Sequence, residues 1–227
     1  MSNPESHAEA LDLSEKGRNK GEVITLNRRL FMKFTAFGGS TDIAPVAAAL
    51  DASGLTGALY VDANDHRGIG VVISSEDTDC FINEMRELFS QPPFADLVHK
   101  PEFDMLGRTY SIGYEPDLVE TLLRKPVHKL TNPATPWAVW YPLQRAKGFY
   151  RLPHEQQMKI LSEHGNLAHR YAAGGNANDL RLACHGLDRN DNDFVVGLIG
   201  PNLHPLSAVV QEMRKTEQTA QYLDSLG

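Results

Sequence analysis

Cysteine and long hydrophobic runs are scarce in this chain. Its 227 residues include two cysteines, Cys80 and Cys184, which form no CxxC pair and exclude a disulfide framework or a cysteine-based zinc site. We interpret both as reduced, buried thiols. No window approaches the roughly 18 apolar residues of a membrane-spanning helix, and the polar N-terminus has no apolar core of a secretory signal. These absences predict a cytoplasmic protein with no membrane partner.

Runs of basic residues are missing too. The formal net charge is −7 and the pI is about 5.7, so the chain does not attract nucleic acid. Apolar residues make up 41% of the chain and charged residues 22%, as in ordinary globular proteins. A chain of this length buries a sizeable hydrophobic core without the help of disulfide bonds or metal sites. The sequence therefore predicts a globular enzyme or binding protein with small-molecule partners.

The first half of the chain follows a β-α-β-β-α-β order. Residues 1–22 are polar, and we expect them to be a mobile tail. Apolar periodicity and turn residues then predict strands at 29–37, 57–62, 69–74 and 107–114, and helices at 43–50, 76–89 and 118–123. Residues 23–125 are thus expected to form one ferredoxin-like unit.

The second half, residues 126–227, repeats this order. We expect strands at 138–143, 180–186 and 194–199, and helices at 153–171 and 203–223. One further strand, beyond the last helix, would complete a second unit. The predicted fold class is α+β: two ferredoxin-like βαββαβ units that form an antiparallel β-barrel with helices outside, the dimeric α+β barrel type.

One histidine lies within the apolar stripe of the helix at 153–171. Met158, Leu161, His164, Ala168 and Tyr171 recur at intervals of three or four residues, which places them on one helix face. A histidine in such a stripe is most often a core residue that is hydrogen-bonded to the backbone. The alternative is an axial ligand to a haem iron.

Several spaced motifs bear on this alternative. They are WYPLQR at 140–145, LPHEQQ at 152–157, EHG at 163–165, GLD at 186–188, DFVVG at 193–197 and MRKTEQTAQY at 213–222. In this order they resemble the chlorite dismutase family, which includes the coproheme decarboxylases (peroxide-dependent haem synthases). The resemblance is strongest from Trp140 to Tyr222. It implies a haem cofactor, either haem b or coproheme, and peroxide, coproheme or chlorite as substrate. It also implies a homo-oligomer, with a pentameric ring favoured.

The resemblance assigns roles to four residues. His164 of EHG would be the proximal haem and metal ligand, and Glu217 the carboxylate that hydrogen-bonds its other ring nitrogen. Tyr141 would relay a radical to the haem propionates, and Arg145 would pair with a propionate. From the residues alone, Glu217 could equally be a solvated helix carboxylate, Tyr141 a packing aromatic and Arg145 a charge in solvent.

Three more residues are assigned to the wall around the cofactor. Phe149 and Tyr150 stand where chlorite dismutases have paired tryptophans, and Leu143 belongs to the WYPLQR motif. The aromatic character of the shell is retained although the tryptophan pair is not.

The distal side of the expected site departs from the family pattern. Chlorite dismutases carry an arginine there and many decarboxylases a glutamine, whereas the corresponding positions here are Ala177 or Asp179. Arg181 lies two residues beyond Asp179 on the same strand face and is one candidate; His128 is the other. The missing arginine counts against chlorite chemistry more than against decarboxylation. The favoured function is therefore conversion of coproheme to haem b with hydrogen peroxide; a chlorite dismutase or haem peroxidase, and a non-catalytic haem-binding protein, remain alternatives.

Overall fold

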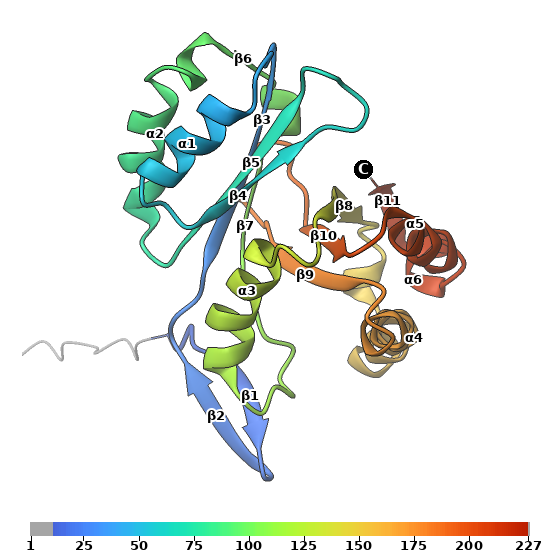
Figure 1. Cartoon of the computed structure of the whole chain (residues 1–227). Helices are drawn as coiled ribbons and strands as arrows, with labels where there is room; N and C mark the ends of the chain where they lie inside the picture. Colours follow the sequence, from blue (N-terminus) through green and yellow to red (C-terminus); the bar gives the residue numbers. More distant parts are fainter. Residues whose placement is uncertain (1–10, 227) are drawn as a thin grey trace, which may run out of the picture.

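The computed structural model describes residues 11–226, which form one large antiparallel sheet flanked by helices, and a separate hairpin (Figure 1). The α+β class expected from the sequence is confirmed. In the described residues the large sheet has nine strands in the order β11-β8-β10-β9-β7-β3-β5-β4, with β6 paired to β3. No helix within residues 11–226 is long and apolar enough to cross a membrane.

Four strands from the first half of the chain pair in the ferredoxin-like order. Their order is β7-β3-β5-β4, which is fourth, first, third and second along the chain. The strands are β3 (Phe31–Gly38), β4 (Gly57–Val61), β5 (Ile69–Ser75), the short β6 (Val98–His99) and β7 (Met105–Arg108), and the helices are α1 (Ala44–Ala52) and α2 (Glu84–Phe89). Short 3₁₀ turns occupy Thr78–Phe81, Phe94–Asp96 and Pro101–Phe103. The last strand, β7, begins at Met105 and ends at Arg108, so it is shorter than the predicted strand at 107–114 and starts two residues earlier.

The second four strands repeat that order as β11-β8-β10-β9. The strands are β8 (Trp137–Arg145), β9 (Asn178–Ala183), β10 (Phe194–Gly200) and β11 (Leu223–Leu226), and the helices are α4 (His154–Ala173), α5 (Leu203–Met213) and α6 (Glu217–Tyr222); a 3₁₀ turn spans Phe149–Arg151. The further strand expected beyond the last helix is thus β11. The single helix predicted over 203–223 is wrong, because extended backbone at Thr216 (φ −69°, ψ 150°) separates α5 from α6.

The two halves share one inner core. The sheet continues between them through the pair Arg108–Ala183, and it folds back so that the Trp140 ring on β8 lies 6.0 Å from Phe34 and 6.3 Å from Tyr60 on β4. Cys184 is buried in this core and Cys80 in the layer under α1 and α2, so the expected burial of both thiols is confirmed. Among the described residues β4 and β11 do not pair, and the hydrogen-bonded path is open rather than a closed barrel.

Not every helix lies outside the sheet. Helices α1 and α2 cover the outer face of the first unit, and α4 and α5 that of the second (Figure 1). A π-helical turn (Glu120–Arg124) and α3 (Lys125–Thr131) instead contribute Leu122 and Leu130 to the inner core. The boundary expected between the two units, between residues 125 and 126, therefore lies inside one continuous helical segment.

The N-terminal segment is more ordered than its polar sequence predicted. Residues 1–10 lie outside the described residues, but β1 (Glu15–Asn19) and β2 (Glu22–Leu26) form a hairpin within or beside the expected tail. The Glu15 carboxylate lies 2.9 Å from Arg108 Nη1 and accepts a 2.9 Å hydrogen bond from the Ser111 backbone N–H. These long-range polar contacts hold the hairpin together with Ile24 and Leu26, which alternate with Thr25 on β2 and pack against the inner core.

Close packing of Trp140 against Gly197 yields a test of the core. The two residues are cross-strand partners, and a Cβ added at Gly197 would lie 2.6 Å from the indole ring. Gly197→Ala is expected to lower the free energy of unfolding by about 1–3 kcal/mol in urea titrations, because the ring must shift. Gly148→Ala is the matched control, since nothing lies within 4 Å of that position and its backbone is already helical. Equal stability of the two variants would contradict this packing.

Candidate functional site

The outer face of the second unit carries most of the candidate residues. Along β8, Trp140 points into the inner core while its neighbour Tyr141 points toward α4 and α5. Val196 of β10 pairs with Tyr141 on one side and with Arg181 of β9 on the other. Pairing therefore brings Tyr141 and Arg181, 40 positions apart, to the same level of one sheet face.

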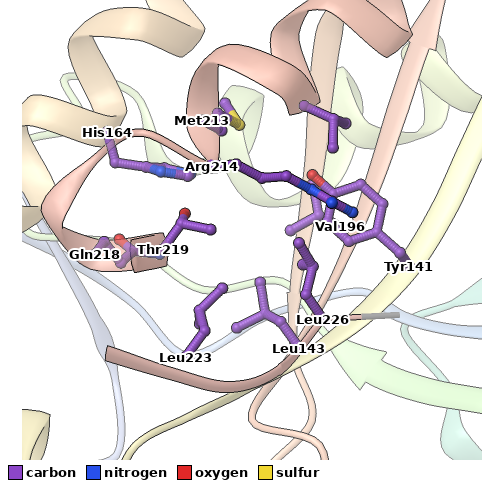
Figure 2. A pocket seen from close by; sticks show the side chains of 11 residues that line it. Tyr141, Leu143, His164, Val196, Met213, Arg214, Gln218, Thr219, Leu223 and Leu226 are labelled. Carbon is purple, nitrogen blue, oxygen red and sulfur yellow. The ribbon is translucent and has the colours of Figure 1, made fainter. Parts of the chain in front are cut away.

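Helix α4 places His164 over this face. Ile160 and Leu167, one turn before and after it, are the two buried residues of the helix. The predicted stripe is thus shifted slightly, because Met158 and Leu161 are only half-buried. Figure 2 shows His164 and Tyr141 on opposite sides of an apolar cavity. The cavity is lined by Tyr141, Leu143, His164, Val196, Val210, Met213, Arg214, Gln218, Thr219, Leu223 and Leu226.

The hydrogen bond at the His164 ring determines which ring nitrogen is free. Nδ1 lies 3.4 Å from the Thr216 hydroxyl oxygen, and that hydroxyl donates to the Met213 carbonyl at 2.8 Å. Since the hydroxyl hydrogen is used there, Thr216 is the acceptor and Nδ1–H is the donor. The Nε2 lone pair is then available toward the cavity, the tautomer that a metal-ligating imidazole requires.

Burial keeps this imidazole neutral. Desolvation is the largest cause that lowers the His164 pKa from 6.5 to about 4, and the nearby cations Arg181 and Arg145 lower it further. At neutral pH the ring is therefore uncharged and can act as a ligand.

Thr216, rather than Glu217, occupies the position beside His164 Nδ1. Thr216, the residue before α6, is buried with 5% of its surface exposed, and the Glu217 backbone N–H donates to Glu163 Oε2 at 2.9 Å. Within residues 11–226 the Glu217 carboxylate makes no hydrogen bond to His164. The role expected for Glu217 is not seen in this arrangement.

Arg145 is held rigidly at the end of β8. Its guanidinium carbon lies 4.9 Å from the Phe149 ring centroid and 4.4 Å from that of Phe194. Its backbone N–H donates to Asp193 Oδ2 at 2.7 Å, while its buried Nε has no hydrogen-bond partner among the described residues. An unpaired buried N–H favours an acceptor that the chain itself does not provide.

The two aromatic candidates after β8 differ in burial. Phe149 is 1% exposed and supports Arg145, whereas Tyr150 is 47% exposed and packs edge-on against Phe149 at 5.7 Å. Neither lines the cavity, in contrast to Leu143.

The expected distal candidates lie in different surroundings. Arg181 Nε is 2.9 Å from Asp179 Oδ2, and the Lys129 ammonium is 3.5 Å from the same carboxylate. His128 is exposed on α3, so Lys129 rather than His128 reaches this group. Asp179 offsets much of the charge of Arg181.

Tyr141 and Arg214 meet across the cavity. Burial raises the pKa of Tyr141 to about 12, with the Asp179 carboxylate also raising it and Arg214 opposing. Figure 2 shows the Arg214 side chain reaching from the turn after α5 toward the Tyr141 ring. The sequence reasoning missed Arg214 and Thr216, although both lie in the MRKTEQ motif from which Glu217 was chosen.

Comparison with known proteins identifies the family. The family model described as chlorite dismutase matches residues 72–226, more than half of the chain. The chain belongs to the chlorite dismutase family.

Solved structures agree on the fold at low identity. Chlorite dismutase from Candidatus Nitrospira defluvii in complex with imidazole superimposes with a TM-score of 0.66 and 14% identity, covering 89% of each chain. A mutant of the same enzyme in complex with cyanide gives a TM-score of 0.67 and 15% identity, covering 89% of this chain and 88% of that one.

A curated relative is longer than this chain. A Halobacterium salinarum protein, provisionally named as heme-binding, is 26% identical over 154 residues. The match covers 62% of this chain and 30% of that protein.

The lowered pKa of His164 makes folding depend on pH. The unfolded chain binds a proton at this residue near pH 6.5 and the folded chain only near pH 4, so the stabilisation is complete above pH 6.5 and is lost as the pH falls toward 4. Between these values wild type should lose on the order of 2–3 kcal/mol that His164→Leu does not lose, measured by urea unfolding. His169→Ala, on the exposed side of α4, should retain the wild-type pH dependence.

Proposed function

We propose that this protein binds an iron porphyrin through His164 and acts as a peroxide-dependent coproheme decarboxylase. The observation that supports this most directly is the neutral His164, whose free Nε2 faces Tyr141 across one apolar cavity. Family membership and the provisional heme-binding name of the Halobacterium relative point in the same direction.

The side chains suit a porphyrin, whereas the present cavity is small. A neutral imidazole, an apolar lining and the cation of Arg214 match an iron, a macrocycle and a propionate, whereas Arg145, with its enclosed and unpaired Nε, lies outside the lining residues. The open space is only about 20 Å³, room for about one water. Porphyrin binding therefore requires α6 and β11 to move outward, since they contribute Gln218, Thr219, Leu223 and Leu226 to the lining. Strand β11 pairs with β8 over three positions with a register shift, against seven positions between β8 and β10.

Replacement of the ligand tests porphyrin binding. His164→Ala is expected to lower the affinity for ferric coproheme by roughly a hundredfold or more in absorbance titrations, because the iron loses its protein ligand. His169→Ala is the matched control on the same helix and should bind as wild type does. Equal binding by wild type and His164→Ala would refute the ligand assignment.

The proposed reaction converts a propionate into a vinyl group. The side chain loses CO2, one methylene proton and two electrons, and one H2O2 takes up the two electrons and two protons to give two waters. The bound iron porphyrin supplies the oxidising power of peroxide at the site. Tyr141 gives up its phenolic hydrogen atom and regains one from the propionate methylene. Its raised pKa keeps that hydrogen on the oxygen, and Arg145 and Arg214 provide cations for the carboxylates.

Removal of the Tyr141 hydroxyl tests its role in decarboxylation separately from coproheme binding. Tyr141→Phe should slow vinyl formation by more than about a hundredfold, measured by mass spectrometry after peroxide is added, while coproheme affinity is unchanged. Tyr171→Phe is the control, because that hydroxyl donates to Glu212 instead. Normal turnover by Tyr141→Phe would exclude the radical relay.

Chlorite decomposition is the second candidate because Arg181 lies level with Tyr141 on the sheet. Its pairing with Asp179 weakens the charge that it could offer to an oxyanion. Oxygen release from chlorite by the haem-loaded protein would favour this reaction. A haem complex that yields neither product would leave a non-catalytic binding protein.

A further inference from the structure

A second, larger cavity lies in the first ferredoxin-like unit. It has a volume of about 250 Å³, against about 20 Å³ beside His164. Its lining residues are Lys33, Thr35, Phe37, Met85, Phe89, Phe94, Ala95, Leu97, His99 and Asp104. None of them takes part in the site proposed above.

This cavity occupies the same place in its unit as the His164 cavity does in the other. Lys33, Thr35 and Phe37 lie on the helix-facing side of β3, the first strand of the unit, as Tyr141 and Leu143 do on β8. The second helix and the segment before the fourth strand complete the wall in both units. The repeated fold therefore leaves a hollow in each unit, and each hollow has its own side chains.

One wall of the first-unit cavity is aromatic. The Phe37 centroid is 5.0 Å from that of Phe89 and 5.7 Å from that of Phe94, and Phe89 is 5.0 Å from Phe94. The Phe37 and Phe89 rings meet edge-on at 79°. Packed phenyl rings of this kind form a pre-arranged surface for a small apolar or aromatic group.

The other wall is polar and carries one cation and one anion, Lys33 and Asp104. His99 Nε2 lies 2.9 Å from Asp104 Oδ1 and 3.1 Å from Oδ2, and the Lys33 ammonium forms a long ion pair with Oδ2 at 3.9 Å, too far for a hydrogen bond. Thr35 is 3% exposed, and its hydroxyl has no hydrogen-bond partner among residues 11–226. Lys33 and Thr35, two residues apart on one strand face, thus remain as donors at the edge of the aromatic wall, although the Thr35 hydroxyl is enclosed and reaches a ligand only by rotation of its side chain.

We propose that this cavity binds a small aromatic monocarboxylate, whose carboxylate accepts hydrogen bonds from Lys33 and Thr35 while its ring packs against Phe37, Phe89 and Phe94. The Asp104 carboxylate in the same lining already has His99 as a hydrogen-bonded partner, whereas the Lys33 ammonium donates no hydrogen bond among the described residues, so an anionic ligand gains more here than a cationic ligand of the same shape. A volume of about 250 Å³ accommodates a single ring and is small for a porphyrin. This binding is independent of the proposed haem chemistry.

Benzoate is the probe, and benzylamine is its counterpart of opposite charge. Isothermal titration calorimetry of the full chain should detect benzoate binding, with benzylamine at least about tenfold weaker. Lys33→Met should weaken benzoate about tenfold, because the charge-assisted hydrogen bond is lost. Equal binding of the two probes, or tighter binding of benzylamine, would overturn the proposal, as would no binding of benzoate by wild type.

Thr35→Val distinguishes a binding role from a structural one. Removal of an unpaired buried hydroxyl should raise Tm without ligand by roughly 2–4 °C, while benzoate affinity falls several-fold. A purely structural Thr35 would lose stability instead and leave the affinity unchanged.

Blocking the cavity gives the last comparison. Ala95→Phe should abolish benzoate binding by filling the space, and Ala52→Phe, on the exposed side of α1, is the matched control. Benzoate that still binds Ala95→Phe, or that is lost in His164→Ala, would place the ligand elsewhere.

Discussion

The alternation of side chains along β8 is the constraint on which both the core and the site depend. Trp140 closes the inner core between the two units, and Tyr141, the next residue, must then face α4 and α5. A slip of one residue in the register with β10 would exchange the two and expose the indole. The geometry of the proposed site is therefore fixed by hydrophobic burial on the opposite face of the sheet, rather than by contacts among the site residues.

Much of this arrangement was predictable because it rests on local periodicity. The strands at 138–143 and 194–199 and the helix at 153–171 carry period-two or helical patterns, and the positions of Tyr141, Leu143 and His164 follow from them. The strand order within each unit also followed from the element order. What periodicity cannot determine is whether the sheet closes, since that depends on twist accumulated over many strands.

The parts that were not predicted depend on contacts distant in sequence. The hairpin at 15–26 is anchored through Glu15 by residues more than 90 positions away, and its apolar alternation, Ile24 and Leu26, is too short to predict a strand. Helix 203–223 has a continuous helical composition, yet it breaks at Thr216, whose extended backbone separates α5 from α6 and whose hydroxyl accepts from His164. The choice of Glu217 over Thr216 followed family resemblance; the direction of a side chain at a helix end depends on backbone geometry, which a motif does not contain.

The joint between the units has a mechanical consequence. Strands β7 and β9 share a single paired position, Arg108 with Ala183, so few backbone hydrogen bonds tie one unit to the other. Small relative rotations of the units are resisted by side-chain packing in the shared inner core, where Trp140 contacts Phe34 and Tyr60 and where Leu122 and Leu130 are buried. The two hollows are connected through this shared inner core, of which the aromatic contact is one part. The indole of Trp140, one of the two tryptophans of the chain, lies in this contact, so its fluorescence responds to movement between the two units.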